Sequence, residues 1–212
     1  YAGLPPDLVM VSDDNALQFI MDRRSMFPGV PVVFCGINDQ ELRSARGRGN
    51  ITGVIETPDI RATLELGLRF HPDTGTVYVI YDGVTSSRAA VRQLRRLIPD
   101  FEHRVRFEYL AGLPAAQLED AVAALPPGGI VYLISFFRDG DGAFVSEQRC
   151  RELLEHAAVP VYTSWDFYVG GGVLGGVTVS GYQQGRTAAR LAIRVLGGTP
   201  AGSIPVTAKS PN

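Results

Sequence analysis

Short apolar runs rich in β-branched and aromatic residues alternate along the chain with longer segments whose apolar residues recur at helical spacing. The clearest case is the segment 76–98, where a continuous apolar run ends at Asp82-Gly83, a turn signal. Ser86 or Ser87 is then the expected cap of a helix. The apolar residues of this helix recur at helical spacing: Ala90, Val91, Leu94, Leu97 and Ile98. A strand, a tight polar loop and a helix make half of a βαβ unit.

The same alternation continues from end to end. Strands are predicted at 7–11, 30–37, 51–55, 76–81, 105–110, 129–135, 159–163, 177–179 and 204–207. Helices are predicted at 16–26, 58–70, 86–98, 114–125, 146–157 and 182–196, and the polar segment 40–50 is predicted to be a loop or short helix. Strand–helix alternation of this kind predicts an α/β fold with parallel, doubly wound sheets and right-handed crossovers.

The predicted elements divide into two lobes, each with its own parallel sheet. We assign 1–56 and 180–197 to lobe one, and 57–179 and 203–208 to lobe two. Lobe one supplies few strands and begins abruptly on an apolar one, so we expect its first part to be missing from this chain. An exposed apolar sheet edge tends to pair with another chain. We therefore expect self-association through lobe one, as in a homodimer, or partial disorder of that lobe.

Composition places the chain among ordinary globular proteins, with 45% hydrophobic and 20% charged residues. A formal net charge of −2 gives no reason to expect nucleic acid as a partner. No run of about 18 apolar residues occurs, so a membrane partner is expected only through segments outside this chain. The two cysteines, Cys35 and Cys150, are predicted to be unpaired, because a strand and a distant helix rarely meet disulfide geometry.

Several motifs are too weak to indicate chemistry. Residues 170–175 match G-x-G-x-x-G, but no helix follows directly, so a loop is predicted and not a dinucleotide site. Residues 139–142 resemble the start of a calcium loop, but the remaining spacing fails and a turn is expected. The three histidines have no partner at metal-ligand spacing. No cofactor, metal or catalytic residue is predicted.

Polar and aromatic residues follow the predicted strands, at the edge where open α/β sheets bind ligands. They form five loops: 12–15 and 36–39 in lobe one, and 82–87, 135–137 and 164–167 in lobe two. Aromatic walls with a few fixed polar groups suit a small organic molecule. Phe137 and Phe167 are expected to be packing residues, whereas Trp165, the only tryptophan, is expected to contact ligand.

Five stretches together resemble the ABC-transporter substrate-binding family of the type I periplasmic binding fold. In order they are Pro-Val-Val-Phe-Cys-Gly-Ile-Asn-Asp, Asn-Ile-Thr-Gly-Val-Ile-Glu-Thr, Val-Tyr-Val-Ile-Tyr-Asp, Pro-Val-Tyr-Thr-Ser-Trp-Asp and Ser-Gly-Tyr-Gln-Gln-Gly-Arg-Thr-Ala-Ala. The Phe-Phe-Arg-Asp and Trp-Asp-Phe-Tyr stretches are more similar to the members that serve as extracytoplasmic sensor domains of membrane histidine kinases or diguanylate cyclases. The family normally has two further βα units before Asp7.

The resemblance implies a two-lobed protein that closes on a ligand in the cleft between its lobes. Its lobe crossings would lie at 50–57, 177–182 and 197–203. The residues that match the family's cleft loops are Asp14, Asn38, Thr57, Asp82, Ser86, Phe136, Trp165 and Asp166. The ligand would be amino-acid-like or aromatic, with a carboxylate, Asp166 or Asp82, for its amine.

Three functions remain open. The first is an extracytoplasmic or periplasmic sensor domain, tethered to the inner membrane, that signals to a kinase or cyclase without being an enzyme itself. The alternative is the solute-binding protein of an ABC transporter. The second alternative is an α/β hydrolase-like enzyme using Asp82 or Asp166, which the lack of a nucleophile or base partner disfavours.

Overall fold

The fold is that of a computed structural model that describes residues 4–38 and 49–207. It divides the chain into two compact units: unit 1 is 1–57 with 180–212, and unit 2 is 58–179. The chain therefore passes between the units after Thr57 and again after Val179. Most of the segment 40–50, predicted as a loop or short helix, lies outside the described residues.

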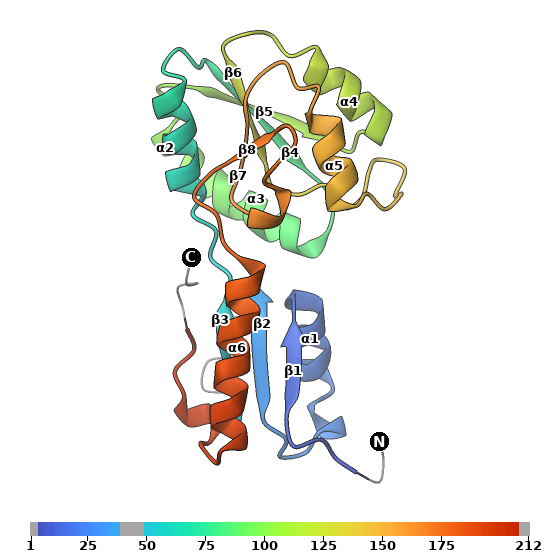
Figure 1. Ribbon diagram of the computed structural model, residues 1–212, viewed down its shortest axis with the longest axis vertical. Helices are drawn as coiled ribbons and strands as arrows, with labels where there is room; N and C mark the ends of the chain where they lie inside the picture. Colours follow the sequence, from blue (N-terminus) through green and yellow to red (C-terminus); the bar gives the residue numbers. More distant parts are fainter. Residues whose placement is uncertain (1–3, 39–48, 208–212) are drawn as a thin grey trace. The chain divides into compact units, whose positions relative to one another are not determined.

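Unit 1 contains a parallel sheet of three strands in the order β1-β2-β3 (Figure 1). The strands are β1 (Val9–Ser12), β2 (Val32–Ile37) and β3 (Ile51–Ile55). Every residue of β3 is buried, as a strand covered on both faces requires. β1 forms one edge of the sheet and alternates half-buried and exposed residues, among them Met10, which is 49% exposed.

One helix packs on each face of this sheet. α1 (Asp14–Asp22) buries Leu17 and Ile20 against a cluster that includes Val32 and Phe34. α6 (Gly181–Leu196) packs on the other face with a separate cluster. That cluster comprises Val33, Val54, Ala188, Leu191, Ala192, Val195, Ala201 and Ile204. Successive residues of β2 therefore serve different cores, which fixes the register of the strand.

The end of the chain corrects two expectations about the lobes. Residues 203–208 were assigned to lobe two, but Thr207 forms a parallel bridge with Val54 and Thr52 donates its hydroxyl hydrogen to the carbonyl of Ile204 at 3.0 Å. The short helix η5 (Ala201–Ser203) lies in unit 1 as well. The segment 197–203 is thus no third crossing, because pairing with β3 keeps 201–207 in unit 1.

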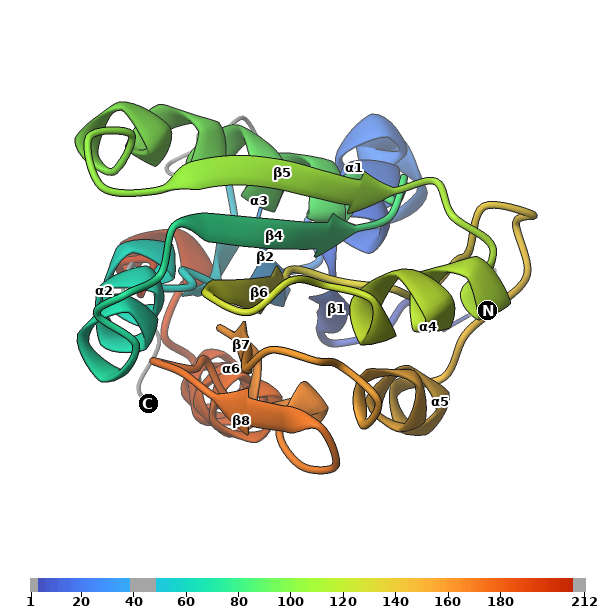
Figure 2. The ribbon, with the colours of Figure 1, turned by 90° about the horizontal axis from the view of Figure 1, so that it is seen from above.

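Unit 2 contains a parallel five-stranded sheet in the order β5-β4-β6-β7-β8 (Figure 2). The strands are β4 (Thr76–Tyr81), β5 (Arg106–Ala111), β6 (Gly129–Leu133), β7 (Val161–Thr163) and β8 (Val173–Gly175). The chain leaves β4 toward β5 on one side, and then returns to β6 and continues to the other side. The carboxyl ends of β4 and β6 therefore form the topological switch point of the sheet. The fold class predicted from the sequence, α/β with two parallel sheets, is confirmed.

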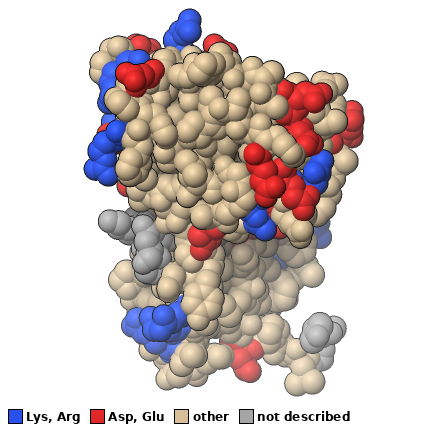
Figure 3. Space-filling view, turned by 45° about the horizontal axis from the view of Figure 1, so that its top comes forward, with Lys and Arg blue, Asp and Glu red and all other residues tan. Residues whose placement is uncertain are grey.

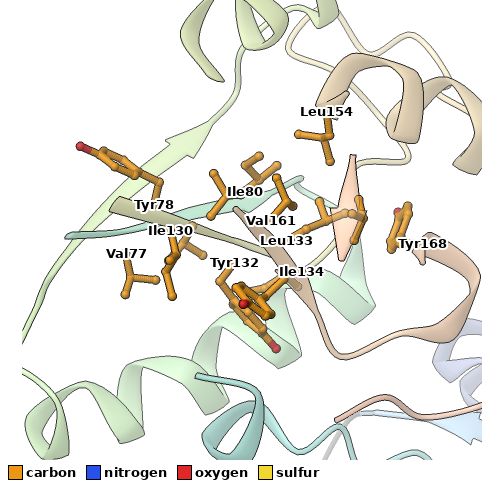
Figure 4. Close-up of a cluster of buried hydrophobic side chains, with 14 of the residues drawn as sticks. Val77, Tyr78, Ile80, Ile130, Tyr132, Leu133, Ile134, Leu154, Val161 and Tyr168 are labelled. Carbon is orange, nitrogen blue, oxygen red and sulfur yellow. The ribbon is translucent and has the colours of Figure 1, made fainter. Parts of the chain in front are cut away.

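Four helices cover the two faces of this sheet (Figures 1 and 2). α2 (Ile60–Phe70) packs beside α3 (Thr85–Leu97), and α4 (Ala115–Ala123) beside α5 (Glu147–Leu154). Figure 4 shows side chains of β6, and of Ile134 directly after it, on both faces of the sheet: Tyr132 and Ile134 point one way, and Leu133 points the other way, toward Leu154 and Tyr168. The core is one continuous apolar cluster, because both faces of the sheet are buried.

Two details of unit 2 differ from the sequence prediction. Ser86 and Ser87 do not cap α3; its N-cap is Val84, which has no capping side chain. The strand expected at 177–179 is reduced to one bridge between Val179 and Trp165, and β8 lies earlier, in the glycine-rich passage. A Cβ atom at Gly172 would collide with the carbonyl of Leu154, so this glycine lets the passage run against α5.

On the face of unit 2 that Figure 3 shows, charged side chains lie mainly at the borders. Arg149 of α5 pairs with Glu119 of α4 at 3.1 Å and with Glu152 at 3.6 Å. Arg149 and Glu152 are exposed and Glu119 is half-buried, and ion pairs at the surface contribute about 0–1 kcal/mol each. The stability of unit 2 therefore comes from its apolar core. No helix within 4–38 and 49–207 is long and apolar enough to cross a membrane.

Candidate functional site

Asp82 lies at the switch point of unit 2, directly after β4, and its carboxylate organises the loops there. Oδ1 accepts a hydrogen bond from the Ser135 hydroxyl at 2.9 Å and from the Val84 N–H at 3.3 Å. Oδ2 accepts from the N–H groups of Phe137 at 2.7 Å and Arg138 at 3.3 Å. Asp82 is only 4% exposed. Its carboxylate is thus buried and satisfied by four donors, and it fixes the loop after β6 relative to the start of α3.

The start of α3 faces the same edge of the sheet. Thr85, Ser86 and Ser87 form its first turn, where N–H groups lack partners within the helix. Ser86 is half-buried, whereas Ser87 is buried, and its hydroxyl has no hydrogen-bond partner among the described residues. A helix start of this kind favours an anionic group such as a carboxylate.

Aromatic side chains surround this edge, but not as the sequence suggested. Phe136 is 2% exposed, and its N–H donates to the Tyr168 hydroxyl at 3.1 Å. Phe137 is half-buried and Phe167 is 38% exposed, with ring centroids 6.0 Å apart. Tyr168 contacts both rings, at 5.8 and 4.6 Å. Phe137 and Phe167, expected to be packing residues, are therefore more open to solvent than Phe136.

Trp165 and Asp166 follow β7 and differ from each other in exposure. Trp165 belongs to the apolar core and is 7% exposed. Asp166 is half-buried and begins the short helix η4 (Asp166–Tyr168). Its carboxylate forms no hydrogen bond or ion pair with the described part of the chain. Asp166 is thus better placed than Asp82 to receive a ligand cation.

Unit 1 brings together the carboxyl ends of all three of its strands. Asp14, at the start of α1, is buried, and its Oδ1 accepts the N–H of Asn38 at 2.9 Å. The Asn38 side-chain amide donates to Oε2 of Glu56 at 2.8 Å. Thr57 follows directly and is half-buried. The chain Asp14–Asn38–Glu56 therefore crosses the sheet edge from β1 to β3.

Backbone geometry at the end of β1 is unusual. Asp13, the N-cap of α1, has φ 78° and ψ 156°, a conformation that non-glycine residues rarely adopt. The adjoining Gly36 has φ 68°, and a Cβ on it would lie 3.4 Å from the Asp13 nitrogen and the Ser12 hydroxyl. Such strain persists where the surrounding structure holds it, as at binding sites.

Two residues of this edge were missed by sequence reasoning. Gln184 in the first turn of α6 is 2% exposed; its Oε1 accepts the N–H of Gly36 at 3.2 Å and its Nε2 donates to the carbonyl of Ile55 at 3.4 Å. Glu56 directly follows a predicted strand, as Asn38 does, and that position was the available signal. The signal for Gln184 was its helical spacing, because it lies four residues before Ala188 on the buried face of α6.

The thiols, the buried tyrosine hydroxyls and the metal-ligating side chains of the described residues do not form a reactive or metal-binding site. Cys35 and Cys150 are unpaired, as predicted. Burial raises the pKa of the Cys150 thiol to about 12, and it also raises the pKa values of the Tyr132 and Tyr168 hydroxyls. All three groups therefore keep their protons near neutral pH. No group of His, Cys, Asp or Glu within 4–38 and 49–207 could hold a metal ion.

The sequence profile of one family, described as ABC transporter substrate binding protein, matches residues 18–212. The chain belongs to this family. Its members are binding proteins and not enzymes, so the chain is a small-molecule-binding protein, and the hydrolase alternative is set aside. The comparison with curated proteins found no match.

Solved structures support the fold. A conserved domain protein from Vibrio cholerae O1 biovar El Tor has a TM-score of 0.71 at 21% identity, over 98% of this chain and 70% of that one. An ABC domain in complex with L-Trp from Streptococcus pneumoniae has a TM-score of 0.68 at 19% identity, over 99% and 70%. A ligand-free, open substrate-binding protein with adhesive properties from Clostridium difficile has a TM-score of 0.65 at 16% identity, over 95% and 68%.

Proposed function

We propose that this chain binds an amino-acid-like molecule as the solute receptor of an ABC transporter, outside the cytoplasm. The observation that carries the proposal is the arrangement at the carboxyl edge of unit 2. Asp82 fixes the loops there. The carboxylate of Asp166 is available to a ligand cation, and the N–H groups at the start of α3 are available to a ligand anion. A ligand with both an amine and a carboxylate uses both kinds of group.

The half-buried ring of Phe137 and the exposed ring of Phe167 supply an apolar surface beside these polar groups. They favour a ligand with an aromatic or large apolar side chain. The relative in complex with L-Trp has a ligand of this kind. We propose that the loops of unit 1 near Asp14, Asn38 and Thr57 contact the same ligand, and that ligand closes the two lobes about residues 57 and 179.

The sensor role is the second candidate. It is favoured by the stretches 136–139 and 165–168, which resemble those of sensor domains. The matching family and two of the similar structures are described as binding or ABC proteins, which favours the transporter role. In a sensor, the ligand would change the kinase or cyclase activity of the full-length protein; in a receptor, it would stimulate the ATPase of a transporter.

Calorimetric titration with a panel of L-amino acids tests the proposal. We expect L-phenylalanine, L-tyrosine or L-tryptophan to bind, and Asp166→Asn to weaken binding about tenfold or more. Asp73→Asn, an exposed carboxylate outside these loops, is the matched control. Phe137→Ala and Phe70→Ala form a second matched pair, because Phe70 is 62% exposed on α2.

Two results would contradict the proposal. If no amino acid of the panel binds, the ligand class is wrong. If one binds and neither Asp166→Asn nor Phe137→Ala weakens it more than its control, the ligand site lies elsewhere.

A further inference from the structure

The segment that carries Trp165 is paired with the last residue of unit 2. The N–H of Val179 donates to the carbonyl of Ser164 at 2.9 Å, and the N–H of Asp166 donates to the carbonyl of Val179 at 3.1 Å. Beyond Val179 the chain passes to unit 1. The position of Trp165 is thus set by the segment that leaves the unit, through two backbone hydrogen bonds.

Three buried hydroxyls, those of Tyr132, Ser164 and Thr63, also hold the segment that carries Trp165 in place. Ser164 Oγ lies 3.0 Å from the Tyr132 hydroxyl and 2.9 Å from Thr63 Oγ1. Thr63 Oγ1 accepts the N–H of Val177 at 3.0 Å and lies 3.3 Å from its carbonyl oxygen. Tyr132, Thr63 and Ser164 are each 0% exposed. The three hydroxyls thereby join β6, α2, the end of β7 and the segment 177–179.

The direction of these hydrogen bonds follows from the acceptor that is available to each hydroxyl proton. Ser164 is the one partner of the Tyr132 hydroxyl among the described residues, so the buried Tyr132 proton goes to Ser164. Ser164 then donates to Thr63, and Thr63 donates to the carbonyl of Val177. Burial raises the pKa of Tyr132, which keeps this first proton in place. In the reverse direction the Tyr132 proton would be left without an acceptor.

The packing around Thr63 is tight enough to make this arrangement specific. A Cβ on Gly176 would lie 2.6 Å from Cγ2 of Thr63 and would collide with the carbonyl of Thr163. Only glycine therefore lets the segment before Val177 approach α2 so closely. α2 begins three residues after Thr57, where the chain enters unit 2.

We propose that Thr63 and Ser164 are positioning residues, which fix Trp165 and Asp166 to the two segments where the chain enters and leaves unit 2. A change in the backbone at either passage then moves the ligand-binding loop through hydrogen bonds. The expected effect on ligand binding rests on the proposed function. The positioning itself concerns the free protein and is testable without a ligand.

The test uses Trp165 as a reporter, because it is the only tryptophan of the chain. Thr63→Val keeps the shape of the side chain and removes its hydrogen bonds to Ser164 and Val177. In the ligand-free protein we expect acrylamide quenching of Trp165 to rise about twofold or more, because the segment opens locally more often. Thr63→Ser should restore the wild-type value.

Thr74→Val is the matched control. Thr74 is also buried, and its hydroxyl donates to the carbonyl of His71 at 2.7 Å, before β4 and away from Trp165. This variant should lose stability without a change in quenching. If Thr63→Val does not fold, Thr63→Ala with the same Thr63→Ser comparison takes its place.

Unchanged quenching in Thr63→Val, or an equal rise in Thr74→Val, would overturn the proposal. A second arm measures L-phenylalanine binding by calorimetry, and we expect Thr63→Val to weaken it about tenfold while Thr74→Val does not. Absence of binding in the wild type would contradict the proposed ligand alone, since the quenching result stands without it.

Discussion

The Ser135 hydroxyl donates a hydrogen bond of 2.9 Å to Asp82 and so joins the ends of β6 and β4. Between these two strands the connections of the sheet run in opposite directions, which is where open α/β sheets bind ligands. The carboxylate of Asp82 also accepts three backbone N–H groups. Both carboxylate oxygens of Asp82 therefore already accept hydrogen bonds. Asp82 supports a ligand site by holding the loops in place, and it has no free oxygen for the ligand.

Asp82→Asn should destabilise unit 2 by about 1–3 kcal/mol, because one oxygen that accepts from N–H groups is replaced by a donor. Urea unfolding followed by Trp165 fluorescence measures this loss. Asp59→Asn is the control: Asp59 caps α2 by accepting the N–H of Ala62 through one oxygen, which asparagine retains. Equal losses in the two variants would show that Asp82 is no more than a turn residue.

Asn38→Asp should destabilise unit 1 near neutral pH, because it places a third carboxylate between Asp14 and Glu56. Like charges at this distance raise the pKa of at least one carboxyl. Protonation relieves the repulsion, so the loss of stability should shrink as the pH falls from about 7 to 4. Amide hydrogen exchange in β1, β2 and β3 measures it. Asn38→Ala, which adds no charge, should not show this pH dependence.

Most of the fold could be predicted because buried strands appear in the sequence as continuous apolar runs between polar residues. β3 was predicted to the residue, since five buried residues stand between Asn50 and the polar Glu56. The strand at 173–175 could not be predicted. It directly follows Gly171 and Gly172, which suggest a loop in the sequence but in the structure allow close packing against the end of α5. Residues 203–208 were assigned to the wrong lobe, because the sequence of one short apolar run does not show which of two parallel sheets it joins.

The candidate site was predictable as a set of loops but not atom by atom. Polar residues after strands identified the positions of Asp14, Asn38 and Asp82. The sequence could not show that Asp82 is saturated by four donors, because those donors come from residues more than fifty positions away as well as from Val84. Nor could it separate Phe136 from Phe137, since neighbouring residues beyond a strand end have no fixed alternation.

Raised pKa values predict a loss of stability in alkali. Burial raises the Cys150 pKa from 9.0 to about 12, so between these values the unfolded chain binds fewer protons than the folded one. The free energy of unfolding should therefore fall as the pH rises above 9, by about 1.4 kcal/mol per unit for one group. Urea unfolding at pH 8, 9 and 10 measures the slope. Cys150→Ala should reduce it, and an unchanged slope in that variant would contradict the assignment.

The hydroxyl chain from Tyr132 to Val177 predicts unequal effects for its first two members. Ser164→Ala leaves the buried Tyr132 proton without an acceptor and should cost about 1–3 kcal/mol. Tyr132→Phe removes the donor together with its need for a partner, while Ser164 still donates to Thr63, so it should cost less. The double variant should then be more stable than the sum of the single losses predicts, by about 1 kcal/mol. Urea unfolding reported by Trp165 gives all four stabilities. Strict additivity, or a larger loss for Tyr132→Phe than for Ser164→Ala, would show that the proton of Tyr132 is not directed at Ser164.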